Sequence, residues 1–423
     1  MQVIPSATRI AALALLVPSA FTQQVIVVDA AGGGDHLDLP AAVSAADVGD
    51  VLLVRTGSYT APTISKGLAI VADSGADVEV LDPTVVSGTP PGEPVLLSGL
   101  TLRDHSWWAW HPLQLKSCEG PIRLDHLTVK GASVGSFAQG NGGDAAQVVG
   151  CEDVASMRST FKGGSAGEDP FGDSIHGNFI SGAGMRVKSS RVAAWRTVFE
   201  GGDGSAAAMM LSSAGAGGAG MRLREQSELF GFLNLFQGGR GGDSLDFSSD
   251  WCGPGGSGLL ARASRAFEQA CIFLGGEGGS ATNFSPPKDC DDGVPTDLGR
   301  PLVALPGLPR GLEGPRVLRE GEVGQFTAYG TAGDRVSLAW STRTAFRHAP
   351  RLEGGWISPP TAIALEPIGT IGGSGQLQWS FTAPDLPASK EARVAYVQLI
   401  TRDATGGVRL GSPISIVVLD AGL

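Results

Sequence analysis

The chain has 423 residues, of which 63 are glycine, roughly twice the average share, and only 17% are charged. Its hydrophobic content of 42% allows a sizeable core and argues against wholesale disorder. The net charge of −11 argues against nucleic acid as a partner, because that binding needs a basic face, and it is compatible with cations or neutral sugars.

Residues 1–23 have the pattern of a secretory signal peptide. Arg9 supplies a positive charge, Ile10 to Val17 form a short apolar stretch, and Ser19–Ala20 offer small residues for cleavage. The apolar stretch is too short to span a membrane, and no transmembrane segment is expected after the signal is removed. The sequence therefore predicts a protein that is secreted or held at the cell surface.

Residues 24–284 are expected to form a coil of short strands, and the pattern of its opening is clear in residues 25–81. One amphipathic helix is predicted at Leu39–Ala46, where it would cap the open apolar end of the coil. The strands predicted in this region are Val25–Asp29, Val51–Arg55, Ala61–Ile64, Leu68–Ala72 and Val78–Leu81.

This opening resembles the N-terminal region of pectin-lyase-like proteins, which include pectate lyases and pectin methylesterases. The shared features are a Gly-rich turn with Asp, the helix, a "GD" before a strand, a "G-x-Y" turn and an "I-x-K-x-L-x-I" pattern. They lie at Gly32–Gly34 with Asp35, Ala41–Ala46, Gly49–Asp50, Gly57–Tyr59 and Ile64–Ile70. The resemblance implies a right-handed parallel β-helix of the secreted bacterial type.

The resemblance does not extend to the catalytic motifs of that superfamily. Thr60–Ala61 follow Tyr59 where the esterases carry a glutamate. The lyases need acidic calcium ligands beside a basic residue on one strand face, and the repeats described below place no such cluster. We therefore expect a binding protein rather than an enzyme.

The densest aromatic cluster of the chain follows this opening region. Aromatic rings stack on sugar rings, and neighbouring polar groups would orient the sugar hydroxyls, so the cluster is a candidate carbohydrate-binding site. The alternative is a corner at which the tryptophans pack against the coil. The candidate residues are Asp104, His105, Trp107, Trp108, Trp110 and His111.

Internal repeats then determine the expected fold. Paired glycines recur at Gly163–Gly164, Gly201–Gly202, Gly238–Gly239 and Gly275–Gly276, with spacings of 38, 37 and 37 residues. A phenylalanine precedes each pair by two positions. These are Phe161, Phe199, Phe236 and Phe273. Such short units bury a core only when they stack in parallel, so that equivalent residues lie above one another.

Stacking makes four structural predictions. The phenylalanines form a ladder inside the coil, and a polar column lies beside it. The paired glycines occupy a corner that needs positive φ. The long Gly-rich excursions that follow them gather on one face of the coil, either as a binding face or as a passive ridge. The residues of the predicted polar column are Ser159, Thr197, Asn234 and Cys271.

Two further candidate sites are weaker. Arg123, Asp125 and His126 could take part in acid–base chemistry, although a solvated strand face explains them as well. The segment Gly238–Leu245 matches one copy of a calcium-binding nonapeptide, with Asp243 as the candidate ligand. Tandem copies are lacking, because Ala206 and Ser280 occupy the equivalent positions. No cofactor is therefore expected, and calcium at Asp243 is the one weak candidate.

The cysteines test the register of the repeats. Cys118 and Cys151 share one repeat position, whereas Cys252 and Cys290 lie 14 and 15 residues after their glycine pairs. Equivalent residues on neighbouring turns of the coil, here called rungs, should lie within the Cα–Cα distance that a disulfide needs. Cys252–Cys290 and Cys118–Cys151 are therefore predicted disulfides. Cys271 is expected to remain a buried free thiol.

The pattern changes in the last third of the chain. Residues 285–315 are rich in proline and glycine and are expected to be a linker, and residues 316–421 are expected to be a small antiparallel β-sandwich. This module resembles terminal sandwich modules of bacterial surface and secreted proteins, notably in "LQWSFTAPDLP" and "AYVQLITRD". Its predicted strands are Gln325–Tyr329, Arg335–Trp340, Thr361–Leu365, Gly375–Phe381, Val394–Thr401 and Ile414–Leu419.

The sequence as a whole predicts an all-β protein, with a right-handed parallel β-helix followed by the sandwich. The favoured interpretation is an exported, non-catalytic protein that binds polysaccharide or cell-envelope components or acts in adhesion. One alternative is a polysaccharide lyase or glycoside hydrolase acting in a groove of the coil. Another is a structural component of a surface layer.

Overall fold

The computed structural model describes residues 23–104, 111–133, 141–167, 180–206, 214–244, 252–281, 288–358 and 363–423. They form two compact units, one covering residues 25–309 and the other containing residues 310–423. The predicted signal peptide lies, apart from its last residue, outside the described ranges.

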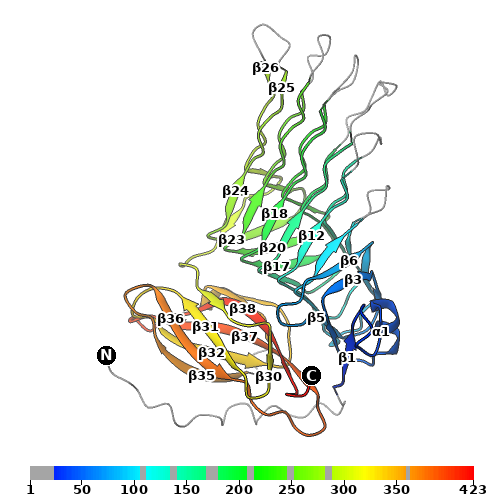
Figure 1. Cartoon of the computed structure of the whole chain (residues 1–423). Helices are drawn as coiled ribbons and strands as arrows, with labels where there is room; N and C mark the ends of the chain where they lie inside the picture. Colours follow the sequence, from blue (N-terminus) through cyan, green and yellow to red (C-terminus); the bar gives the residue numbers. More distant parts are fainter. Residues whose placement is uncertain are drawn as a thin grey trace. The chain divides into compact units, whose positions relative to one another are not determined.

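The unit of residues 25–309 is a coil whose chain passes through three parallel sheets in each turn (Figure 1). The first sheet has ten strands, and each aligns in register with its neighbour in the next turn. In spatial order they are β1 (Val25–Val28), β2 (Val51–Val54), β5 (Ala69–Ala72), β8 (Val95–Ser98), β11 (Ile122–Asp125), β14 (Val154–Met157), β17 (Arg191–Trp195), β20 (Glu228–Phe232), β23 (Arg265–Gln269) and β28 (Val303–Ala304).

The second and third sheets have eight strands each. The strands of the second sheet are β3 (Gly57–Thr60), β6 (Val78–Leu81), β9 (Thr101–Arg103), β12 (Thr128–Lys130), β15 (Thr160–Lys162), β18 (Val198–Glu200), β21 (Leu235–Gln237) and β24 (Ile272–Leu274). The strands of the third sheet are β4 (Thr63–Ile64), β7 (Thr84–Ser87), β10 (Leu113–Lys116), β13 (Ala146–Val149), β16 (Met185–Lys188), β19 (Met221–Arg224), β22 (Leu259–Ala261) and β27 (Thr296–Leu298).

The opening of the coil is closed by helix α1 (Leu39–Ala45), as the amphipathic pattern predicts. The Asp38 side chain caps the helix by accepting a hydrogen bond from the Leu39 N–H, and Leu39 is fully buried. The predicted turn at Gly57–Tyr59 is instead strand β3. The Tyr59 side chain is buried in the coil, with 2% of its surface exposed, and its hydroxyl donates to the Arg55 carbonyl at 2.9 Å.

The predicted phenylalanine ladder is confirmed. The ring centroids of Phe161 and Phe199 lie 5.4 Å apart, those of Phe199 and Phe236 5.1 Å, and those of Phe236 and Phe273 4.9 Å. Adjacent rings are near parallel, at 7° to 12°. Each rung therefore covers the aromatic ring of the rung before it.

The polar column beside this ladder also forms, but backbone groups satisfy most of it. The Ser159 hydroxyl accepts from the Leu127 N–H at 3.0 Å, and the Asn234 side-chain oxygen accepts from the Thr197 N–H at 2.8 Å. Cys271, at the end of the column, is partly exposed rather than buried, because it lies near the last turns of the coil.

The paired glycines do not occupy positive-φ corners, contrary to the prediction. Positive φ at the corner between the first and second sheets belongs to other residues, such as His126 at 51°, Arg158 at 48° and Arg196 at 50°. The glycine pairs instead begin extended legs that leave the coil after the second sheet and return to it before the third (Figure 1). We call these paired legs the glycine array. Its outgoing legs are residues 131–133, 163–167, 201–206, 238–244 and 275–281, and its returning legs are residues 141–145, 180–184, 214–220, 252–258 and 288–295.

Hydrogen bonds join outgoing and returning legs in one continuous zigzag. The Gly202 N–H donates to the Gly182 carbonyl, the Gly218 N–H to Gly202, the Gly239 N–H to Gly218 and the Gly256 N–H to Gly239, at 2.8 to 2.9 Å. The legs thus replace a sheet with two interleaved rows of extended chain. Short strands β25 (Ser280–Ala281) and β26 (Lys288–Asp289) pair near the outer end of the last excursion.

Within one leg the direction of hydrogen bonding repeats every three residues. The Gly238 N–H donates to Leu274, the last residue of β24, and the Gly241 N–H donates to Glu277 on the outgoing leg that follows it. The Gly239 N–H donates to a returning leg, and the Arg240 N–H donates to the side chain of Asp203. A three-residue period without hydrogen bonds inside the leg is the geometry of polyproline II rather than of a pleated strand.

The unit that contains residues 310–423 is the predicted antiparallel sandwich, so the predicted fold class of the chain is confirmed. A three-stranded sheet consists of β29 (Gly311–Glu313), β31 (Val323–Tyr329) and β36 (Gln376–Thr382). A five-stranded sheet consists, in order, of β30 (Val317–Arg319), β38 (Val408–Leu419), β37 (Ala392–Arg402), β32 (Arg335–Ser341) and β35 (Ala364–Thr370). A hairpin of β33 (Arg347–Ala349) and β34 (Gly354–Trp356) brackets the 3-10 helix η2 (Pro350–Leu352).

Strand pairing shows that the predicted linker 285–315 is not a free connection. Its residues form β27, which aligns with β22, and β28, which aligns with β23, so the coil makes a further turn. Residues 311–313 then start the sandwich as β29. Proline and glycine are frequent in this segment, so its composition indicates a linker although it contains these two short strands.

Candidate binding face

The outer face of the third sheet carries the most distinctive group of charged side chains in the coil. Alternate residues of its strands, such as Leu113, Leu115, Met185 and Val187, point into the core. The residues between them therefore point outward. Register aligns these outward residues in two columns, which are Gln114, Gln147, Arg186 and Arg222, and Lys116, Val149, Lys188 and Arg224.

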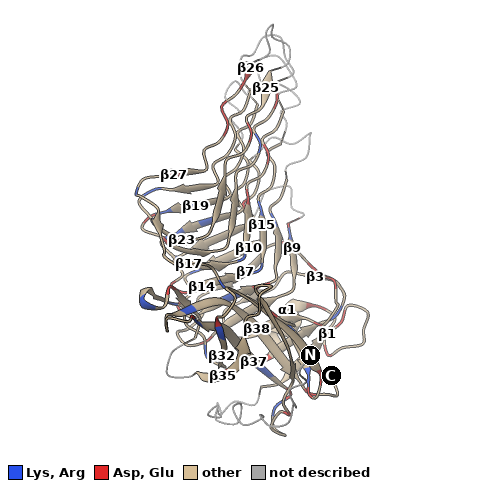
Figure 2. Ribbon diagram, turned by 90° about the vertical axis from the view of Figure 1, so that its left-hand side faces the viewer, with Lys and Arg blue, Asp and Glu red and all other residues tan. Residues whose placement is uncertain are grey.

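We call the five cations of these columns the cationic strip, namely Lys116, Arg186, Lys188, Arg222 and Arg224. Lysine and arginine positions are blue in Figure 2, where β19 is labelled. Adjacent rungs repeat at about 4.8 Å, so like side chains recur at that interval along the coil. The signal for the strip was present in the sequence, because these are the polar partners of the alternating apolar pairs, but it becomes visible only once the register is known.

A buried carboxylate anchors one end of the strip. Asp144 is 1% exposed, and its Oδ2 lies 2.7 Å from Nε of Arg186 and 3.7 Å from Nδ1 of His111. Its Oδ1 accepts from the Ala183 N–H at 2.7 Å. Asp144 therefore hydrogen-bonds through Oδ1 and forms an ion pair with Arg186 through Oδ2.

His111 is uncharged at neutral pH. Burial lowers its pKa below 6.5, and the raising effect of nearby Asp144 does not overcome the cost of burial. The charge of this face therefore comes from its lysines and arginines.

Two arginines of the strip have no ion-pair partner among the described residues, namely Arg222 and Arg224. Burial lowers the pKa of Arg222, which remains a cation because arginine titrates far above neutral pH. Lys188, by contrast, pairs with Glu225 at 3.0 Å. The unpaired guanidiniums beside two glutamines can donate hydrogen bonds to an anionic ligand.

The predicted aromatic sugar site is only partly described. His105, Trp107, Trp108 and Trp110 lie outside the described residues. Asp104 directly follows β9, and His111 lies two residues before β10, close to Asp144. The carbohydrate role of this cluster remains a prediction.

The Arg123, Asp125 and His126 group is not a solvated face. Arg123 and Asp125 are both fully buried. Arg123 forms a two-pronged ion pair with Asp153, at 2.7 and 3.0 Å, and Asp125 forms another with Arg158, at 2.9 Å for each oxygen. Paired charges of this kind are structural, because removing one partner would leave an uncompensated buried charge.

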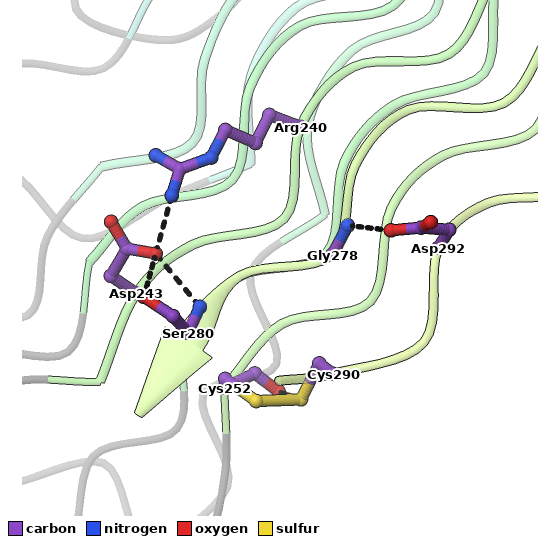
Figure 3. Close-up of a disulfide and its surroundings, with 7 residues drawn as sticks. All are labelled: Arg240, Asp243, Cys252, Gly278, Ser280, Cys290 and Asp292. Atoms are coloured by element: carbon purple, nitrogen blue, oxygen red, sulfur yellow. Dashed lines mark hydrogen bonds and ion pairs between the residues drawn. A yellow bond between two sulfur atoms is a disulfide. The ribbon is translucent and has the colours of Figure 1, made fainter. Parts of the chain in front are cut away.

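The calcium candidate Asp243 is occupied by hydrogen bonds within the glycine array (Figure 3). Its Oδ1 accepts from the Ser280 N–H at 2.8 Å and lies 2.7 Å from Arg240. Partial burial raises the pKa of Asp243, but the contacts with Ser280 and Arg240 together outweigh it, so the pKa lies below its ordinary value. In the described ranges, no three His, Cys, Asp or Glu side chains are grouped to hold a metal ion.

The two predicted disulfides have different outcomes. Cys252 and Cys290 are bonded, with a Cα–Cα distance of 5.7 Å, and they join successive returning legs (Figure 3). Cys118 and Cys151 are free thiols, 0% and 1% exposed, so that disulfide prediction is wrong. The Cys118 thiol instead lies 3.5 Å from two backbone carbonyls, that of Val86 on the preceding turn and that of Lys116 on its own.

No known family model matches the chain. No curated protein matches its sequence either. Among the helices of the described residues, none is long and apolar enough to cross a membrane.

Proposed function

We propose that the chain is an exported, non-catalytic member of the pectin-lyase-like β-helix superfamily that binds an acidic polysaccharide along the cationic strip. The stacked parallel sheets support the superfamily assignment, together with the capping helix and the opening motifs. A glycan with repeated carboxylates suits a face on which cations recur from rung to rung.

The observation that carries this proposal is the pair of unpartnered guanidiniums on β19. Arg222 and Arg224 point outward from the same strand, and Gln147 and Arg186 extend the row across neighbouring rungs. Arginine binds carboxylates through two parallel hydrogen bonds, which gives orientation as well as affinity. The net charge of the whole chain is −11, so this local excess of cations is opposite in sign to the rest of the protein.

A non-catalytic role agrees with the state of the carboxylate on this face. Asp144 is buried, and its oxygens bind Arg186 and the Ala183 N–H. A general acid or base must reach the substrate with a free oxygen or a proton. Asp144 therefore serves to position Arg186.

Binding of polygalacturonate to the full chain tests this proposal, with dextran as the neutral comparison. We expect polygalacturonate to bind at low ionic strength, and we expect the affinity to fall as salt rises. The double variant Arg222→Gln with Arg224→Gln should bind at least about 10-fold more weakly. The matched control replaces Arg191 and Arg265, which pair with Glu228 on the first sheet, and should change affinity less than about 2-fold.

Three results would contradict the proposal. Equal affinity for dextran would remove the role of charge, and equal losses in both double variants would remove the role of the strip. Release of unsaturated or reducing ends from the polygalacturonate would show that the protein is a lyase or hydrolase.

A further inference from the structure

The outer face of the five-stranded sheet in the sandwich contains a cleft. Its volume is about 750 Å³, within the range of small-molecule sites. Strands β32, β35, β37 and β38 supply its floor, and Trp356 of β34 forms part of its wall. Val336 and Leu338 point into the core of the sandwich, so their neighbours Arg335 and Ser337 face the cleft side.

Two arginines lie directly opposite each other in this cleft. Arg335 on β32 aligns with Arg402 on β37, and both side chains are exposed. Like charges directly opposite one another on neighbouring strands are unfavourable. Neither guanidinium has an ion-pair partner among the described residues.

The nearby carboxylates are already bound to other arginines. Asp334, next to Arg335 in the chain, pairs with Arg310 at 2.6 Å. Asp403, next to Arg402, pairs with Arg409 at 3.0 Å, and Glu353 binds the same Arg409. The two opposed cations of the cleft therefore lack an anion from their own chain neighbours.

The rest of the cleft is mainly apolar. Leu365 is 62% exposed, which is unusual for a large apolar side chain, and Ile400, Val408 and Trp356 extend the apolar lining. Pro367 on β35 removes a hydrogen-bond donor from this edge strand, which disfavours the addition of a peptide strand. The cleft thus offers a cationic pair and an apolar wall without a backbone ladder.

We propose that this cleft binds a long-chain monocarboxylate, with its carboxylate between Arg335 and Arg402 and its tail against Leu365 and Ile400. A single carboxylate between two guanidiniums relieves their repulsion, and the tail covers apolar surface that water now contacts. The site is separate from the cationic strip and does not depend on its function.

Titration of the full chain with dodecanoate, below its micelle concentration, tests this proposal. Tryptophan fluorescence and calorimetry should both report binding, because Trp356 lines the cleft. Dodecanol, which has the same tail and no charge, should bind at least about 10-fold more weakly. The variant Arg335→Gln with Arg402→Gln should lose that preference, whereas Leu365→Ser should weaken both ligands.

The control is Arg351→Gln, an exposed arginine of η2 that does not line the cleft. It should leave dodecanoate affinity unchanged. No dodecanoate binding by the wild-type chain, equal affinity for dodecanol, or an equal loss in Arg351→Gln would each overturn the proposal. Tighter binding of an apolar peptide with a free C-terminus would replace the fatty acid by a peptide as the occupant.

Discussion

Glycines in the legs of the glycine array have no room for a side chain. A Cβ atom at Gly239 would lie 1.9 Å from the carbonyl oxygen of Gly202, and one at Gly242 would lie 1.8 Å from that of Ser205. Arg240, between them, points outward and pairs with Asp243 at 2.7 Å. Glycine is required here by the close approach of neighbouring backbones and not by positive φ.

Cys271 allows a residue-scale prediction about pH. Burial is the main cause that raises the pKa of its thiol to about 11. The reactive thiolate is therefore about one molecule in a thousand at pH 8, and its share should rise about tenfold for each pH unit until the pKa is reached. Reaction of the native protein with a thiol reagent, followed from pH 7 to 10, should be slow and should accelerate in this way.

The variant Cys271→Ser should abolish this pH-dependent phase, since Cys118 and Cys151 are fully buried. Rapid reaction at pH 7 that does not change with pH would show that Cys271 has an ordinary thiol pKa.

At the scale of elements, the phenylalanine ladder joins consecutive rungs through their second-sheet strands. Phe199 is fully buried between two rings, whereas Phe273 ends the ladder and is partly exposed. The two positions are chemically identical and differ in their number of stacked neighbours and in burial. Substituting each in turn therefore compares the stabilisation by a ring inside the ladder with that by a ring at its end.

Phe199→Ala should lower the free energy of unfolding by about 3–5 kcal/mol, because it removes a buried ring and both stacking contacts. Phe273→Ala should cost about half as much, because part of its surface is already in water. Denaturant unfolding of the two full-length variants measures the difference. Equal costs, or a cost below about 1 kcal/mol at Phe199, would mean that the ladder does not hold the rungs together.

At the scale of the whole molecule, the repeat predicted the stacking of the coil, the ladder and the Cys252–Cys290 bond. Those features depend only on which residues are equivalent, and a regular spacing reveals equivalence. The place of the double glycines does not follow from the repeat, because a glycine pair indicates either positive φ or close packing and spacing does not distinguish them. Asp144 and Arg186 could not be paired from the sequence, since their contact depends on where a returning leg meets the next strand.

The boundary of the coil was predicted too early for a related reason. Strands β27 and β28 are short and lie among prolines and glycines, and they are held by pairing with β22 and β23 rather than by their own pattern. The burial of Arg123 and Asp125 was also missed, because alternation indicates a shared face but not whether that face is covered. Both errors concern tertiary contacts that local pattern does not encode.

The central claim is that the turns of the coil stack with the outgoing and returning legs of the glycine array interleaved. An alanine scan along one leg tests this claim most directly. Alanine at Gly238, Gly239, Gly241 or Gly242 should each lower the free energy of unfolding by at least about 1–3 kcal/mol. Arg240→Ala, and Glu277→Ala on the next leg, should stay within about 0.5 kcal/mol of the wild type. A uniform profile, a two-residue period, or tolerance of alanine at all four glycines would contradict the interleaved, three-residue packing.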